Sequence, residues 1–174
     1  VFRRSDLDPE VDVAADVFNV GDTRLSTCLI KDGVRVATIE HLMSAISALG
    51  IDNLLISLNA PEVPIMDGSS APFIFLLQSA GIAVQKDLKR FIKVTKKISV
   101  TGENGEYACF EPSSTSKFNI SMEFSHPHKC FSAGNCSLDF DLSSVAFQKE
   151  ISRARTFGFL HQYEELRRNN LALG

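Results

Sequence analysis

Short runs in which hydrophobic and polar positions alternate occupy much of the chain, and this period of two predicts β-strands. In the first half these runs cover residues 1–4, 11–15, 25–30, 34–36 and 54–58. In the second half they cover residues 91–94, 98–100, 107–110, 118–124 and 136–140. Residues 31–33 and 102–105 contain Asp-Gly and Asn-Gly, which are typical of turns between paired strands.

A helical period replaces this alternation at residues 39–49, where Leu42, Ile46 and Leu49 recur together with Ala45 and Ala48. This pattern predicts a helix of about three turns. Its expected limits are Thr38, as an N-cap or a neighbour of the cap, and Gly50 just beyond the last apolar residue.

Three further segments have helical character. Residues 72–80 begin at Pro72, which suits a first helical turn, and end before Gly81. Residues 142–151 start as a loop and become helical, and residues 162–169 carry paired opposite charges on one expected face. Because strands precede helices in both halves, the predicted fold class is α+β, with two tandem domains that each combine a β-sheet with two helices.

The polar stretch 85–90 has no apolar period and is the one credible linker, so the predicted domains are residues 1–88 and 89–174. The chain opens on Val1 within strand-forming residues and closes on Gly174 without a polar tail. We therefore expect it to be the central part of a longer protein that lacks elements at both ends.

Composition narrows the class of protein. With 44% hydrophobic and 22% charged residues, the 174-residue chain resembles a soluble globular protein, and its net charge of −3 gives no electrostatic case for nucleic acid. The four cysteines contain no CxxC pair, which predicts reduced thiols and a cytoplasmic location. No apolar run of about 18 residues and no signal peptide is present.

The adjacent pair Glu40 and His41 is the first candidate for chemistry, at the start of the predicted helix. A neutral imidazole is a good zinc ligand, and a neighbouring carboxylate could take a proton from a metal-bound water. Successive helical positions point about 100° apart, so the two side chains could share these tasks. Position 45, where a second ligand of an HExxH motif would lie, is Ala, and a capping or surface role for the pair remains open.

Two polar stretches are further candidates. Asp67, in the turn at residues 66–70, could orient an imidazole or a substrate hydroxyl, or it could form an Asx-turn that caps the following helix. In residues 152–159, the Thr156 hydroxyl could donate a hydrogen bond to a developing oxyanion. The arginines of that segment could pair with phosphate or with carboxylates of the protein, and a solvated or internally paired loop is the alternative.

Three other histidines carry weaker signals. Pro127 holds the backbone extended between His126 and His128, but no further Cys or His lies at ligand spacing, which favours a structural role. His161 is expected at the surface of a charged helix.

Four motifs occur in a fixed order: TIEHL at residues 38–42, GIDN at 50–53, APEVPIMDGS at 60–69 and SRARTFGF at 152–159. Together they resemble the UDP-3-O-acyl-N-acetylglucosamine deacetylase family, the zinc amidases of lipid A synthesis in Gram-negative bacteria, and the resemblance extends over residues 1–174. It implies two α+β domains sandwiched with their helices facing each other, and an active site between them.

The resemblance also implies roles for individual residues. His41 would be a Zn²⁺ ligand, Glu40 the general base that activates the attacking water, and Thr156 a hydrogen-bond donor to the oxyanion. The resemblance further implies that Phe157 packs against substrate and that Leu25 and Ser26 line the site.

In the family a supporting acid lies near the active site, and the resemblance places it at Asp67. The helix from residue 162 would open an insert that builds a passage for the acyl chain.

Parts of the family pattern are missing from residues 1–174. Two further zinc ligands, in a His-Lys-x-x-Asp pattern, and a general-acid His in a Ser-Gly-His-Ala segment would lie downstream. A Gly-x-Gly-x-His segment would lie upstream. One imidazole cannot hold a catalytic zinc, which needs about three protein ligands, so the chain by itself is expected to be inactive.

The expected partner is a UDP-linked acylated glucosamine, not a nucleic acid, and the expected state is a monomer. An amphiphilic substrate is compatible with peripheral contact at the inner membrane, although no basic amphipathic helix supports such contact. The alternative function is a non-catalytic module of the same fold that binds a nucleotide sugar or a partner.

Overall fold

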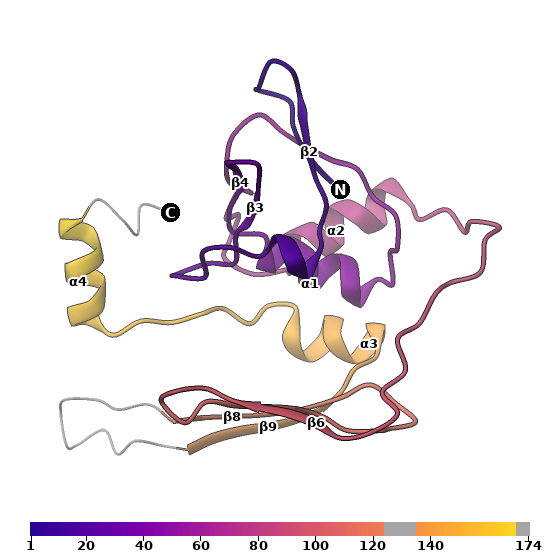
Figure 1. Cartoon of the computed structure of the whole chain (residues 1–174), viewed down its shortest axis with the longest axis vertical. Helices are drawn as coiled ribbons and strands as arrows, with labels where there is room; N and C mark the ends of the chain where they lie inside the picture. Colours follow the sequence, from indigo (N-terminus) through magenta and orange to yellow (C-terminus); the bar gives the residue numbers. More distant parts are fainter. Residues whose placement is uncertain (124–134, 170–174) are drawn as a thin grey trace. The chain divides into compact units, whose positions relative to one another are not determined.

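The computed structural model describes residues 1–123 and 135–169, and its elements are shown in Figure 1. Contacts between Cα atoms divide the chain into two compact units, Val1–Val84 with Phe147–Gly174, and Gln85–Ala146. Helices and small sheets are mixed along the chain, which confirms the predicted α+β class. The domain limits 1–88 and 89–174 stay a prediction, and by contacts the residues from Phe147 onward group with the first unit.

A three-stranded sheet forms the first layer of unit 1. Strand β1 (Phe2–Arg4) lies between β2 (Val11–Val13), to which it is antiparallel, and β5 (Ile56–Leu58), to which it is parallel. Phe2 of β1 is fully buried and faces Val13 and Ile56 across the two ladders. The strands are short because turn-forming residues follow β1 and an irregular segment precedes β5.

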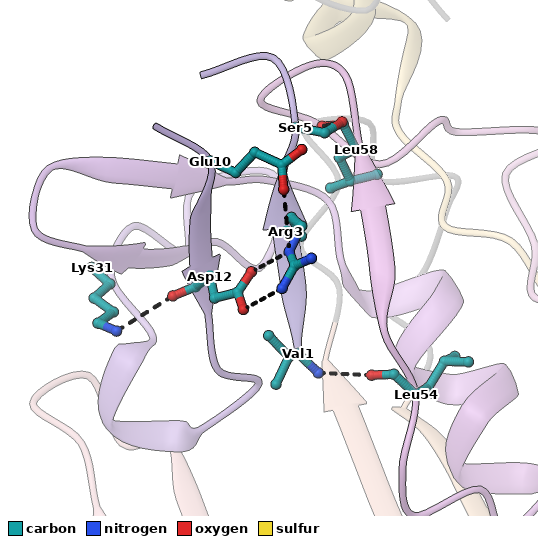
Figure 2. Close-up of polar contacts among 8 residues, drawn as sticks. All are labelled: Val1, Arg3, Ser5, Glu10, Asp12, Lys31, Leu54 and Leu58. Carbon is teal, nitrogen blue, oxygen red and sulfur yellow. Dashed lines mark hydrogen bonds and ion pairs between the residues drawn. The ribbon is translucent and has the colours of Figure 1, made fainter. Parts of the chain in front are cut away.

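Polar contacts lock the register of this sheet, as Figure 2 shows. Arg3 donates two hydrogen bonds to the carboxylate of Asp12, its partner on β2, at 2.7 and 2.9 Å. The Ser5 backbone amide and hydroxyl both donate to the Leu58 carbonyl, at 2.8 and 3.0 Å. A cross-strand ion pair of this kind favours one register over a slipped one.

The hairpin of β3 (Leu29–Lys31) and β4 (Val34–Val36) turns at Asp32 and Gly33, both with positive φ. Arg4 of β1 is 7% exposed, and its guanidinium donates to the Arg35 carbonyl at 2.8 Å and to Asp6 at 2.6 and 2.7 Å. This buried charge is therefore paired, as burial requires, and it ties the sheet to the hairpin.

Two helices complete the core of unit 1. Helix α1 (Glu40–Ala48) and helix α2 (Ala71–Ala80) contact each other. Helix α1 buries the apolar stripe predicted for it, through Leu42, Ala45, Ile46 and Ala48. Helix α2 has Pro72 in its first turn and ends at Gly81, whose φ is 84°. A 3₁₀ turn, η1 (Val17–Asn19), precedes the loop that leads to β3.

Two hairpins make up unit 2, β6 (Ile98–Thr101) with β7 (Tyr107–Phe110) and β8 (Lys117–Glu123) with β9 (Asn135–Asp141), followed by α3 (Ser144–Ala146). In β8 and β9 the register pairs apolar residues with each other, for example Phe118 with Phe140 and Ile120 with Leu138. Alternation thus gives the β8–β9 hairpin one apolar face, and Phe118 and Ile120 remain about half exposed.

The C-terminal part of the described chain consists of a π-helical turn, η2 (Phe147–Ile151), an extended segment and α4 (Leu160–Arg168). The Phe159 amide donates to the Gln162 side chain at 2.9 Å and so caps the start of α4. No helix among the residues that the structure describes is long and apolar enough to cross a membrane.

Two predictions of secondary structure, the strands at 25–30 and 91–94, are wrong. The strand predicted at 25–30 is confined to β3, because backbone hydrogen bonds close residues 22–28 into a loop. Residues 91–94 pair with no strand of the described chain, and Phe91 and Ile92 are 80% and 99% exposed. Of the two positions predicted for Thr38, it takes the one beside the cap: Ile39 is the N-cap of α1 without a side-chain bond, and the Thr38 hydroxyl bonds elsewhere.

Burial predicts opposite outcomes for two phenylalanines. Phe2 is fully buried, so Phe2→Ala should lower the free energy of unfolding by about 3–5 kcal/mol through lost burial and a residual cavity. Phe18 is 94% exposed, so the matched control Phe18→Ala should change it by less than about 0.5 kcal/mol. Urea denaturation measures both values, and equal effects would contradict the core described here.

Candidate functional site

Glu40 and His41 occupy the first turn of α1, directly after the buried residues 36–39. The buried residues of α1 start at Leu42, so the Glu40 and His41 side chains remain partly exposed while the helix itself is fixed by packing. A carboxylate in the first turn also interacts favourably with the unpaired amides of the helix start. The sequence-predicted pair is thus accessible and held on a rigid element.

One oxygen of the Glu40 carboxylate is already engaged. Glu40 Oε2 accepts a hydrogen bond from the Thr27 backbone amide at 3.0 Å, and the Ile39 amide donates to the Thr27 carbonyl at 3.3 Å. Among the described residues no hydrogen bond to Glu40 Oε1 is found. The carboxylate is therefore oriented through one oxygen, and the other is left to accept a proton or a hydrogen bond.

The loop at residues 22–28 (the 22–28 loop) is held at its base. Gly21 donates to the Cys28 carbonyl at 3.0 Å, and Cys28 donates to the Asp22 carbonyl at 3.1 Å. The Asp22 carboxylate accepts from the Arg24 backbone and side chain. These hydrogen bonds from Arg24, together with Arg35, lower the pKa of Asp22 to about 2. A loop closed in this way presents a defined surface at its tip.

Leu25 and Ser26 lie at that tip, directly before Thr27. Leu25 has φ of 64° and is 72% exposed, and the Ser26 hydroxyl lies 3.5 Å from the Cys28 sulfur. Because Thr27 bonds to both Ile39 and Glu40, the structure places Leu25 and Ser26 beside the start of α1. The predicted lining residues and the predicted base thus come together.

Asp67 organises the turn before α2. Its Oδ1 accepts from the Ser69 amide at 3.0 Å and from the Ser69 hydroxyl at 2.8 Å, and its Oδ2 accepts from Arg155 at 3.2 Å. The hydrogen bond from the Ser69 hydroxyl is the main reason that the pKa of Asp67 is lowered, with smaller contributions from the Ser69 amide and Arg155. The Asx-turn predicted for Asp67 is confirmed by its bond from the Ser69 amide, whereas a role in orienting an imidazole or a substrate hydroxyl stays a prediction.

The segment at residues 152–159 (the 152–159 segment) is anchored at this turn. The Ser152 carbonyl accepts from the Ser70 hydroxyl and from the Ala71 amide, both at 3.0 Å, and these serines are 5% exposed. The Ser152 hydroxyl donates to the Gln148 carbonyl at 2.7 Å. The chain from Ser152 to Arg155 is thereby fixed against the start of α2.

Thr156 and Phe157 follow directly after this anchor and are exposed. The Phe157 ring meets Phe159 edge-on at 5.9 Å between ring centres, and Phe159 stacks on His161 at 5.9 Å. His161 is exposed on α4. Thr156 and Phe157 thus follow Arg155, which bonds to Asp67, while Leu25 and Ser26 precede Thr27, which bonds to Glu40.

Several residues that position these groups were not singled out by the sequence. Thr27 acts through its backbone, which no side-chain pattern reports. Ser69 and Arg155 were present in the quoted motifs, but only the fold reveals that both bond to Asp67. Glu62 lies between Pro61 and Pro64 and accepts from Thr38 at 2.6 Å, a contact between segments 24 residues apart that no local pattern reports.

No group of three or more His, Cys, Asp or Glu side chains among residues 1–123 and 135–169 is arranged to hold a metal ion. His41 is the one imidazole at the α1 site, fewer than the about three protein ligands of a catalytic zinc. The described residues therefore do not by themselves fit a complete zinc centre. His126 and His128 lie outside the described residues.

Comparison with known proteins identifies relatives along the whole chain. The family model described as UDP-3-O-acyl N-acetylglycosamine deacetylase matches residues 1–174. Curated proteins named UDP-3-O-acyl-N-acetylglucosamine deacetylase are similar to all 174 residues: that of Nitrosococcus oceani is 54% identical, that of Marinobacter nauticus 53% and that of Thioalkalivibrio sulfidiphilus 52%. In each case the match covers 100% of this chain and 56% of the relative, so the chain spans little more than half the length of these proteins.

The hydrogen bonds to Asp67 predict which of two substitutions raises its pKa more. Because the pKa of Asp67 lies below its ordinary value of 3.8, its ionised form stabilises the fold above that pH, and this contribution is lost as the pH falls through the lowered value. Ser69→Ala should raise the pKa of Asp67 more than Arg155→Gln does, since the Ser69 hydroxyl is the larger cause. Carboxyl ¹³C NMR titration measures both shifts, and the reverse order would contradict this assignment.

Proposed function

Because the chain belongs to the UDP-3-O-acyl N-acetylglycosamine deacetylase family, we propose that it forms part of the active site of a zinc-dependent hydrolase. The enzyme would remove the N-acetyl group of UDP-3-O-acyl-N-acetylglucosamine, with release of acetate and a free amine. The observation that carries this proposal is the Glu40 carboxylate, held through Oε2 by Thr27 and left open at Oε1 next to His41.

We propose that His41 supplies one ligand of the zinc site and that residues outside this chain supply the others. A bound zinc ion supplies a Lewis acid that polarises a carbonyl and lowers the pKa of water. The fit is incomplete within the described residues, so the chain alone is proposed to be inactive.

Glu40 performs the proton transfer. Its free oxygen, Oε1, accepts a proton from the water that attacks the acetamide carbonyl, and the bond from Thr27 keeps the carboxylate from rotating away. A general base contributes only when its geometry is maintained, and here a backbone amide maintains it.

The Thr156 hydroxyl donates to the carbonyl oxygen as negative charge develops there. Its support is the anchor at Ser152 and Arg155, which fixes the backbone immediately before it. Phe157 packs against the substrate, and the tip of the 22–28 loop, with Leu25 and Ser26, lines the site. Asp67 acts through Arg155, so it supports the arrangement and takes no part in bond making.

The biological setting follows from the substrate class. We propose a cytoplasmic, monomeric enzyme of lipid A biosynthesis whose amphiphilic substrate brings it to the surface of the inner membrane. The net charge of −3 gives no support for nucleic acid as a partner.

Separate substitutions at the helix start should divide chemistry from metal binding. In a protein of the relatives' full length that carries this chain, Glu40→Gln should lower kcat by about 10²–10⁴-fold with zinc content unchanged. His41→Ala should lower zinc content as well as activity, because it removes a ligand. Deacetylation assays and metal analysis by mass spectrometry measure these effects.

Full activity in Glu40→Gln would exclude Glu40 as the base. If the wild-type protein of the relatives' full length had no deacetylase activity, the proposal of a deacetylase would be wrong. The alternative, a non-catalytic module that binds nucleotide sugar, would then be favoured. Nucleotide-sugar binding by calorimetry distinguishes that module from an unfolded protein.

The oxyanion role of Thr156 predicts a loss in kcat with little change in KM. Thr156→Val removes the hydroxyl at nearly constant shape and should lower kcat by about 10²–10³-fold. Thr156→Ser keeps the donor and should retain most of the activity. Steady-state kinetics on both variants measures the difference, and a selective rise in KM would instead indicate a role in substrate binding alone.

A further inference from the structure

The residue two positions before α1 has an unusual backbone conformation. Thr38 is 6% exposed and has φ of 56°, in the left-handed region that a β-branched residue rarely adopts. Residues in such conformations persist only where the surrounding contacts hold them, and they are concentrated at functional sites. The chain turns at Thr38 directly into the helix start that carries Glu40 and His41.

Three hydrogen bonds hold this turn to residues 61–63. The Thr38 hydroxyl donates to Glu62 Oε1 at 2.6 Å. On either side of that bond, Ala37 donates to the Pro61 carbonyl at 2.8 Å, and Val63, which is 1% exposed, donates to the Ala37 carbonyl at 3.0 Å. The backbone bonds fix Ala37, and the side-chain bond fixes Thr38 itself, so the direction in which the chain enters α1 is set from the 61–63 side.

The same helix start is also held by the 22–28 loop. Thr27 bonds to Ile39 and to Glu40 Oε2. A change in φ at Thr38 would rotate the first turn of α1 relative to Thr27 and would lengthen or break the bond to the Glu40 carboxylate. The Thr38–Glu62 bond and the Thr27–Glu40 bond are therefore geometrically coupled through the single intervening residue Ile39.

We propose that Thr38 and Glu62 are positioning residues that hold the strained turn before α1 and thereby aim the Glu40 carboxylate. Neither residue takes part in the chemistry: the Thr38 hydroxyl is committed to Glu62, and Glu62 acts through Thr38. The catalytic consequence rests on the proposed function of Glu40, whereas the geometric coupling to the Thr27 amide stands apart from it.

Amide hydrogen exchange tests the coupling without any assay of activity. In a protein of the relatives' full length that carries this chain, Thr38→Val removes the hydroxyl and should make the Thr27 amide exchange about tenfold faster or more. Thr38→Ser restores the donor and should restore protection. The control Thr101→Val alters an exposed residue of β6 and should leave the Thr27 amide unchanged.

A double-mutant cycle tests the partnership of the two residues. Thr38→Val and Glu62→Met should each lower kcat by about 10–100-fold with KM and zinc content nearly unchanged. The double variant should be no worse than either single one, because both remove the same bond. Glu62→Gln keeps an acceptor oxygen and should retain most of the activity.

Each failure has a separate meaning. Unchanged protection of the Thr27 amide in Thr38→Val, or additive losses in the cycle, would overturn the positioning role. A wild-type protein without deacetylase activity would overturn the proposed function, and the exchange measurement would still decide whether Thr38 controls the Thr27–Glu40 bond. Loss of protection throughout β1 in Thr38→Val would indicate general unfolding and would also overturn the proposal.

Discussion

The hydrogen bond from the Thr27 amide to the Glu40 carboxylate is the contact on which the candidate site depends. It joins a loop that has no regular structure to the first turn of a packed helix. Because the loop is closed at its base by Gly21, Asp22 and Cys28, the bond fixes two things together. It orients the carboxylate, and it places Leu25 and Ser26 beside it.

A second set of contacts fixes the backbone before Thr156. Asp67 and Ser152 lie 85 residues apart in the sequence, yet the start of α2 brings them together through Ser70, Ala71 and Arg155. The Ser70 hydroxyl bonds to the Ser152 carbonyl at one end of this contact, and Arg155 bonds to Asp67 at the other. Thr156 thus follows a backbone held by buried serines, although it is itself exposed.

The extent to which the sequence predicted these features differs from element to element. Helices α1 and α2 were predicted within one or two residues, because an apolar stripe at helical spacing and a terminal glycine are local signals. The strand expected at 25–30 was mostly wrong, since residues 25–28 belong to a loop whose shape is set by hydrogen bonds to Cys28 and Glu40, and only Leu29 and Ile30 lie in β3. Residues 91–94 have strand-forming side chains but find no partner strand in the described chain.

The sequence by itself determined the α+β class, the starts of α1 and α2, and the adjacent position of Glu40 and His41 in the first turn of α1. Each of these depends on residues close together in the chain. Only the tertiary structure decided what those residues contact. Thr38 bonds to Glu62 instead of capping its own helix, and Asp67 reaches Arg155. The physical reason is that a hydrogen bond depends on atoms meeting in space at about 3 Å, and the order of residues along the chain does not specify which distant segments will meet.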